Sequence, residues 1–488
     1  MLANNFGLPE VRQFSREAYQ AGTQNWEIIQ HSNGIIYTAN NEGVLEYDGN
    51  VWLLYPLPNR TLVRSVLEGP DGKIYAGGQG EFGYFDIQPN GRLKFFSLIE
   101  LIPEEDQLFG DVWNISIVND QIWFRASEKI YKGNLQGISR TPSYCEFDYM
   151  DSPDGKEVIA NCRRRGMVKW NGQDWEPIFE FEQPFKQVRQ VIALSDGKWV
   201  IASNKDGLWI WDGNVLEPFA EDYSDYWSTS RIYDAALTRD NNLAIATSSG
   251  GLVILSEQGV PIYKLTKSDG LQNNNILSIL SDQHGDLWLG LDNGIDHVEF
   301  SSPISKFSPD GELGGVAYSM AFHDGYAWFA TNNGLFRILW QGYVDPFRPE
   351  SFEYVSNTRG QVWKIREVDN KLYLGHHEGA FAISGKSAEQ LTDEHGTWDF
   401  LLWPGREDLM VGGSYNGLLL FKKINDSWVF QEKLPGLDQS SRIMAPDPQG
   451  WIWVTHPYRG VWKCMLSEDN KLTTRFYDEQ DGFPSNLD

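Results

Sequence analysis

The chain has 488 residues and a formal net charge of −26 at neutral pH, with 67 Asp and Glu against 41 Lys and Arg. This acidic excess argues against nucleic-acid binding, because contacts to phosphates need a basic stripe on the protein surface. The aromatic fraction of 14%, including 20 Trp, suits sheets that are buried on both faces and need wide, flat side chains between them.

The N-terminal segment, residues 1–22, lacks the apolar core of a secretory signal peptide, because the sequence becomes polar at Asn4. No apolar run of about 18 residues occurs in the sequence, so we expect no membrane span within it. Two alternatives stay open at this point. The chain is either cytoplasmic or a piece of an exported protein whose signal lies outside these residues.

One short pattern recurs along the rest of the chain: a Gly/Asp turn, an aromatic–aliphatic strand, and a Gly-apolar strand. Its copies begin at Gly34, Asp71, Asn119, Asp154, Asp196, Asp240, His284, Asp324, Asp369, Arg406 and Gln449. The period averages roughly 42 residues, which is typical of a four-stranded antiparallel blade. A single blade cannot bury both of its faces, so blades must stack radially. The sequence therefore predicts an all-β fold of tandem β-propellers.

The number of copies predicts two domains, because a propeller usually has about four to eight blades. Seven copies end near Phe300, and a Ser/Pro-rich break follows at 301–311. We expect a seven-bladed propeller over residues 1–302 and an incomplete second one over 303–488, with blades 8–11 and the start of a twelfth. Because an unpaired sheet edge would remain at the end, we expect a piece of a longer protein.

The start of each blade's first strand carries the candidate binding residues. A large side chain, aromatic or Arg in most copies, stands about eight residues before each turn Gly. First strands line the central channel of a propeller, so these side chains could form a ring at its mouth that suits a sugar or a small acidic ligand. The predicted ligand-binding residues are Trp26, Arg64, Trp113, Arg189, Tyr233, Tyr318, Trp363, Trp398 and Arg442, with Phe147 and Leu277 at the same position in the two remaining copies. The alternative, which we prefer from sequence alone, is that they wedge adjacent blades apart.

Cys145, Cys162 and Cys464 make an odd number of cysteines. Cys145 and Cys162 flank a turn and could face each other across a hairpin, whereas a bulge at Gly155 would place them on opposite faces. We prefer two buried thiols and keep a disulfide as the alternative. The cysteines therefore do not decide the compartment.

The sequence predicts no metal site, no cofactor and no catalytic residue. His376 and His377 are adjacent on a strand, so they point to opposite faces and do not easily share one metal. The predicted ring contains aromatic residues and Arg but no acid. A polysaccharide lyase or hydrolase would need clustered carboxylates or a His–Tyr pair at the channel mouth. Enzymatic chemistry is thus disfavoured without being excluded.

The pattern at 269–295 resembles the two-component-regulator propeller repeat of bacterial sensor proteins, especially those of the Bacteroidetes group. Further segments resemble the triple-tyrosine-motif subfamily, namely 24–26, 41–49, 63–65, 81–85, 441–442, 453–454 and 460–461. The resemblance covers nearly all of the chain. It implies two seven-bladed propellers outside the cytoplasmic membrane, followed by an immunoglobulin-like domain, a membrane helix and a cytoplasmic output module, often a histidine kinase or a LuxR-type helix-turn-helix.

The function that this resemblance implies is the periplasmic, ligand-sensing region of a membrane-bound signalling regulator. These residues would be non-enzymatic, anchored to the inner membrane only through a downstream segment, and dimeric in the full-length protein. Binding of an unknown small molecule or glycan would shift the arrangement of the domains. Two alternatives remain: a polysaccharide-active propeller enzyme, and a protein-interaction scaffold with an apolar patch on one rim. Fold alone does not choose among them.

Overall fold

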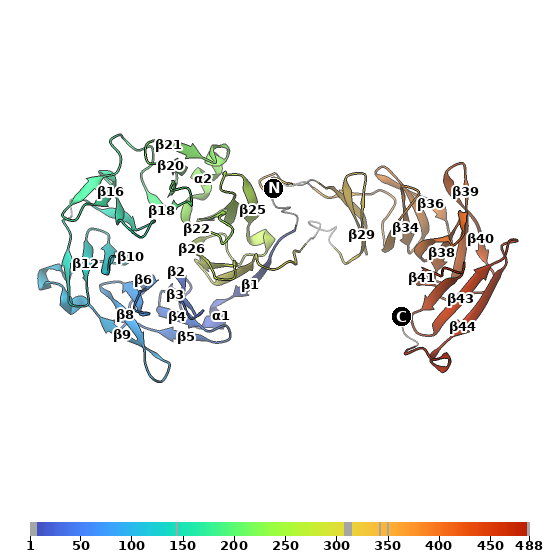
Figure 1. Cartoon of the computed structure of the whole chain (residues 1–488), viewed down its shortest axis with the longest axis horizontal. Coiled ribbons are helices and arrows are strands. Elements are labelled where there is room, and N and C mark those ends of the chain that lie inside the picture. The colour runs from blue at the N-terminus through green and yellow to red at the C-terminus, as the bar shows by residue number, and fades with distance from the viewer. Residues whose placement is uncertain (1–6, 143–144, 307–314, 341–342, 349–350, 486–488) are drawn as a thin grey trace. The chain divides into compact units, whose positions relative to one another are not determined.

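The computed structural model describes residues 7–142, 145–306, 315–340, 343–348 and 351–485, and these residues are almost entirely β (Figure 1). They form eleven four-stranded antiparallel sheets, which confirms the predicted propeller architecture. The helices among them are short: α1 (Arg16–Tyr19), α2 (Ser224–Ser230) and a few 3-10 turns. None of the helices in the described ranges has the length and apolar character needed to cross a membrane.

Contacts divide the chain into two compact units. The first contains Asn5–Lys306 together with Asp345–Arg348, and the second contains Phe307–Val344 and Pro349–Asp488. The first unit holds seven of the sheets and the second holds four. The domain boundary that we predict at residue 302 stays a prediction, although the observed division follows Lys306.

The strands of the first unit follow the chain from sheet to sheet. They are β2 (Asn25–Gln30), β3 (Ile36–Asn40), β4 (Gly43–Tyr47) and β5 (Trp52–Tyr55); β6 (Val63–Glu68), β7 (Ile74–Gly78), β8 (Glu81–Ile87) and β9 (Leu93–Ser97); β10 (Val112–Val118), β11 (Gln121–Ala126), β12 (Ile130–Asn134) and β13 (Gly137–Arg140); β14 (Phe147–Asp151), β15 (Ile159–Cys162), β16 (Gly166–Trp170) and β17 (Trp175–Pro177); β18 (Val188–Ala193), β19 (Trp199–Ser203), β20 (Gly207–Trp211) and β21 (Leu216–Phe219); β22 (Ile232–Leu237), β23 (Leu243–Thr247), β24 (Leu252–Leu255) and β25 (Pro261–Leu265); and β26 (Ile276–Ser281), β27 (Leu287–Leu291) and β28 (Ile295–Glu299).

The ring of the first unit is closed by β1 (Glu10–Phe14), which pairs with β28 as the outer strand of the last sheet. Its register runs from Glu10 opposite Glu299 to Phe14 opposite Ile295. The repeat pattern does not reveal this strand, because β1 lies before the first copy. The closure joins the start of the ring to its end, so the first unit has no open sheet edge at this point.

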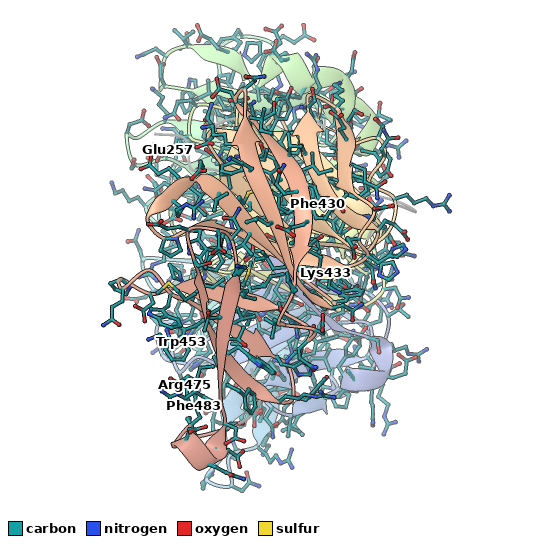
Figure 2. The ribbon with its side chains drawn as sticks, turned by 90° about the vertical axis from the view of Figure 1, so that its right-hand side faces the viewer. Glu257, Phe430, Lys433, Trp453, Arg475 and Phe483 are labelled. Atoms are coloured by element: carbon teal, nitrogen blue, oxygen red, sulfur yellow. A yellow bond between two sulfur atoms is a disulfide. The ribbon has the colours of Figure 1, made fainter. Side chains whose placement is uncertain are left out.

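The second unit repeats the same four-stranded plan. Its strands are β29 (Ala317–His323), β30 (Tyr326–Thr331), β31 (Gly334–Leu339) and β32 (Glu353–Tyr354); β33 (Val362–Val368), β34 (Lys371–His376), β35 (Gly379–Ser384) and β36 (Ser387–Thr392); β37 (Thr397–Trp403), β38 (Arg406–Ser414), β39 (Gly417–Ile424) and β40 (Ser427–Leu434); and β41 (Ile443–Pro446), β42 (Ile452–His456), β43 (Gly460–Leu466) and β44 (Leu472–Tyr477). Figure 2 shows the long strands of this unit with their side chains, including Phe430 on β40 and Arg475 on β44.

The core lies between neighbouring sheets, and β27 shows why the strands are apolar on both faces. Leu287 and Leu289 pack with Ala244 of the preceding sheet, whereas Trp288 packs with Ile36 of the following one. Successive side chains of a strand point to opposite faces, so each face of the blade meets a different neighbour. Full burial of each such Leu contributes about 1.5–3 kcal/mol.

Candidate functional site

Every first strand of the first unit, the strand nearest the middle of the ring in Figure 1, has a β-bulge near its start. At each bulge the register skips one residue, which is left without a partner on the second strand. The skipped residues are Trp26, Arg64, Trp113, Asp148, Arg189, Tyr233 and Leu277. A bulge redirects the side chain of its extra residue, and all seven side chains line one cavity of about 260 Å³ in the channel.

Five of the predicted ring residues therefore do meet, but the fourth sheet differs from the expectation. The spacing of the turn predicts Phe147 at this position, whereas the bulge falls one residue later, at Asp148. Phe147 is buried in the core between sheets, beside Trp175. The mouth of the channel thus contains an acid that the sequence pattern assigns to the wrong face.

Arg64 forms the centre of one side of the mouth. Its guanidinium carbon lies 3.8 Å from the ring centroid of Trp26 and 4.5 Å from that of Trp113, and its Nε donates to Asp111 Oδ2 at 2.8 Å. Trp26 is itself held by a hydrogen bond from Nε1 to Asn41 Oδ1 at 2.7 Å. The Nη1 atom of Arg64 is buried and has no hydrogen-bond partner among the described residues.

The opposite side of the mouth pairs Arg189 with Tyr233, at 5.0 Å from guanidinium carbon to ring centroid. The Nε atom of Arg189 is also buried without a hydrogen-bond partner in the described ranges. Next to it, Asp148 accepts a hydrogen bond from Asn161 Nδ2 at 2.7 Å. Burial raises the pKa of Asp148, although Asn161 and nearby arginines lower it.

Directly below the mouth lies a second layer, made by the residues that follow the bulges. Its cavity-lining members are Glu27, Asn114, Tyr149, Gln190, Asp234 and Ser278. Glu27 Oε2 accepts the backbone N–H of Val66 at 2.8 Å, and Asp234 Oδ2 accepts that of Ile279 at 2.9 Å. Each carboxyl therefore bonds the first strand of the next sheet, which gives this layer a structural role between blades.

These carboxyls correct the expectation that the channel contains no acid. Burial, with a smaller effect from the charges of Asp234 and Asp151, raises the pKa of Glu27 to about 8 against the opposing effect of the Val66 N–H. Burial likewise raises the pKa of Asp234 to about 7, with Asp151 adding to the shift. Asp151, three residues beyond the bulge on β14, also has its pKa raised by burial. Three carboxyls from three different sheets thus interact within the channel.

The channel continues beyond this cavity. Asp151 also lines a neighbouring cavity of about 450 Å³, together with Glu68 and Asp120. Between the third and fourth sheets, the buried Arg125 donates from Nε to Asn114 Oδ1 and from Nη1 to the Phe147 carbonyl, both at 2.6 Å. Burial lowers the pKa of Arg125 to about 9.

The predicted residues of the second unit form an aromatic row. Tyr318 lies 5.0 Å from Trp363, Trp363 lies 4.9 Å from Trp398, and the guanidinium of Arg442 lies 5.4 Å from Trp398. Bulges again place the three aromatic residues. Tyr415, which the pattern misses, joins the row because its hydroxyl accepts from Trp363 Nε1 at 3.1 Å.

The structure joins Cys145 and Cys162 in a disulfide, with their Cα atoms 5.9 Å apart. The preferred interpretation as two buried thiols is therefore wrong. Cys145 lies before β14 and Cys162 ends β15, and the bulge at Asp148 shifts the register near the start of β14. Cys464 is a buried free thiol whose pKa burial raises to about 12.

Among the residues that the structure describes, one group of side chains has the composition of a metal site: Asp282, Asp286 and His297. His297 Nε2 lies 3.7 Å from a carboxylate oxygen of each Asp, and Trp288 Nε1 donates to Asp282 Oδ2 at 3.1 Å.

The second unit repeats this arrangement with Lys463 in place of His. Lys463 Nζ lies 3.5 Å from Asp447 Oδ2, which accepts from Trp453 Nε1 at 3.2 Å. Because an ammonium cannot ligate a metal, the recurring geometry indicates an ion pair that fixes the turn, and we assign no metal to it.

Residues 270–293 match the profile of the family described as two component regulator propeller. The chain carries a two-component-regulator propeller repeat. This confirms the resemblance predicted from the sequence. A search of curated proteins found no match.

Among solved structures, the chain is similar to the extracellular domain assigned to the hybrid two component system BT3049 from B. thetaiotaomicron. The identity is 16% and the TM-score 0.72, over 98% of this chain and 68% of that one. A domain assigned to BT4673 of the same organism gives 16% identity and a TM-score of 0.48, over 96% and 67%. At this identity the BT3049 likeness shows the β-propeller fold.

Proposed function

We propose that these residues form the extracytoplasmic, ligand-sensing region of a membrane-bound bacterial signalling regulator, with the channel of the first propeller as its binding site. The observation that carries the proposal is the cavity at the mouth, where Arg64 Nη1 and Arg189 Nε, and also Asp148 Oδ2 and Ser278 Oγ, are buried without hydrogen-bond partners in the described structure. Buried donors in proteins are nearly always paired. Two unpaired donors that line one cavity therefore favour a ligand that accepts from both.

The disulfide supports the extracytoplasmic location. Bonds such as Cys145–Cys162 persist in oxidising compartments and are rare in the bacterial cytoplasm. The propeller repeat and the fold shared with the extracellular domain assigned to BT3049 point the same way. An output module and a homodimer of the full-length protein, both implied by the resemblance, belong to this proposal.

A binding role fits the channel better than a catalytic one. Four carboxyls line the cavity, and two of them, Glu27 and Asp234, each already accept a backbone N–H of the next sheet. A general acid or base must reach the proton it transfers. The proposal therefore assigns these residues to the shape and charge of the site, and a polysaccharide-active enzyme is the second candidate.

The binding test is a thermal-shift screen of the purified chain against free amino acids, sugars and oligosaccharides, followed by calorimetry. We expect a stabilising compound whose effect is lost in the Arg64→Gln/Arg189→Gln double variant and kept in Arg239→Gln, an exposed position of the same unit. Stabilisation that survives in the double variant would place the ligand elsewhere and refute the site. Turnover of a compound that is lost in Glu27→Gln would establish the enzyme instead.

The location is tested separately in the native host. β-lactamase fused to the protein after residue 488 should confer resistance, because the enzyme acts only outside the cytoplasm. A fusion that is stably expressed but inactive would contradict the extracytoplasmic assignment.

A further inference from the structure

The side chains of the channel are stacked in layers along its axis. The bulged residues form the mouth, the residues after them form the next layer, and Asp151 lies three positions beyond the bulge at Asp148. A strand rises about 3.3 Å per residue, so the cavity extends roughly 10 Å from the mouth to Asp151. Groups at the two ends can therefore contact different parts of one small molecule.

The mouth presents cationic donors. Arg64 is held by Asp111 and two Trp rings, and Arg189 by Tyr233, so both guanidiniums are fixed in place. Each keeps one buried nitrogen without a partner among the described residues. The acid of this layer, Asp148, accepts from Asn161 through Oδ1, while its Oδ2 is buried without a hydrogen-bond partner among the described residues. Two guanidiniums and this one carboxylate therefore line the mouth. An anionic group such as a carboxylate matches this layer.

The deeper part of the cavity, here called the deep layer, has the opposite character. Glu27 and Asp234 lie next to the mouth, and Asp151 lies two residues further along its strand. The three come from different sheets, and apolar residues such as Ile28 and Ile279 line the same cavity. The basic residues that line the cavity are Arg64, Arg125 and Arg189; two of these belong to the mouth, and Arg125 bonds Asn114 and the Phe147 carbonyl.

Carboxylates that share a desolvated site repel one another, so they cannot all ionise together at low cost. A positively charged group between them removes this repulsion. The deep layer is thus suited to an ammonium, whereas the mouth is suited to an anion.

We infer that the ligand of the channel is a small zwitterion, with its anionic group at Arg64 and Arg189 and its ammonium toward Glu27, Asp234 and Asp151. The inference rests on the proposed function of this cavity as the ligand site. A volume of about 260 Å³ lies just below the range of drug-sized pockets, which indicates a molecule of amino-acid or dipeptide size. A neutral sugar would leave both charged layers unmatched.

The test uses three probes with the same six-carbon chain and different charge: 6-aminohexanoate, hexanoate and hexylamine. Five methylene groups separate the charges of the zwitterion, so its extended length is comparable to the roughly 10 Å depth of the cavity. Titration calorimetry on the purified chain should show 6-aminohexanoate binding at least tenfold more tightly than either singly charged probe. Sodium and calcium chloride, titrated alone, measure whether an inorganic cation occupies the deep layer instead.

Two variants assign the ends of the ligand. Arg64→Gln/Arg189→Gln should reduce the affinity for 6-aminohexanoate to that for hexylamine, and Glu27→Gln/Asp234→Asn should reduce it to that for hexanoate. The amide oxygens that the second pair of substitutions introduces can still accept the N–H groups of Val66 and Ile279, so folding is expected to be retained and is checked by circular dichroism.

Equal affinity for all three probes, absence of binding, or binding of calcium alone would overturn the zwitterion. If a neutral compound from the screen binds and the arginine variant abolishes its binding, the zwitterion fails while the proposed function stands. If no compound responds to the arginine variant, the proposed function fails as well.

Discussion

Replacing Phe14 by Ala tests whether the N-terminal strand holds the first propeller closed. Phe14 ends β1 and is 6% exposed. Its ring lies 5.3 Å from Tyr47, 5.5 Å from Trp52 and 5.7 Å from Trp288, so it joins the first sheet of the ring to the last. Truncation of a buried Phe to Ala typically costs about 3–5 kcal/mol, which includes the loss of these ring contacts.

The assay is guanidinium unfolding followed by tryptophan fluorescence, with hydrogen exchange to separate the two units. We expect the transition of the first unit to shift by about 3–5 kcal/mol and the β1 and β28 amides to lose protection. Gln13→Ala is the matched control, because the Gln13 side chain is exposed and donates to the Gly270 carbonyl. A shift below about 1 kcal/mol, or loss of protection spread evenly over both units, would show that closure does not depend on Phe14.

Three further predictions concern the cysteines, the channel and the ion pair. Cys145→Ser/Cys162→Ser should destabilise the first unit by about 3 kcal/mol. Thiol titration of the unsubstituted chain, unfolded without a reductant, should find one free thiol, and three free thiols would exclude the disulfide. The pKa of Glu27 is raised to about 8, so folding favours its protonated form, and the free energy of unfolding should fall as the pH rises from about 4.5 to 8. Glu27→Gln should make this pH dependence flatter. An unchanged dependence in the variant would contradict the assignment. The pKa of Asp282 is lowered to about 2 because the nearby His297 imidazole and the hydrogen bonds from His284 N, Asp286 N and Trp288 Nε1 outweigh the effect of burial. Its contribution to stability is therefore lost as the pH falls from about 4 to 2. His297→Lys should keep this contribution and His297→Ala should cost about 1–3 kcal/mol, whereas a metal site would lose zinc binding in both variants.

The fold could be predicted because the repeat reflects what each turn and each strand requires of its residues. Each turn needs Gly or Asp, and each second strand needs apolar side chains on both faces, so the pattern survives even where the residues change. The closing strand β1 is not marked by the repeat, because its partner β28 lies more than 280 positions away. Phe14 is buried because the closed ring places it between the first and the last sheet.

The candidate site was predicted in outline, and its errors have one physical cause. A strict two-residue alternation places only every second side chain on the channel face. The bulges break this alternation, so that Trp26 and Glu27, although adjacent, both line the cavity. The same one-residue shift exchanges Phe147 for Asp148.

The bulges also link the binding site to the spacing of the blades. Glu27 and Asp234 face the cavity and, at the same time, accept N–H groups from the next first strand, at Val66 and Ile279. An ammonium that approaches these carboxylates competes for the same oxygens or strengthens their charge, and either effect changes the hydrogen bonds between sheets. At the proposed ligand site, binding free energy and inter-blade geometry would therefore be coupled through these shared atoms.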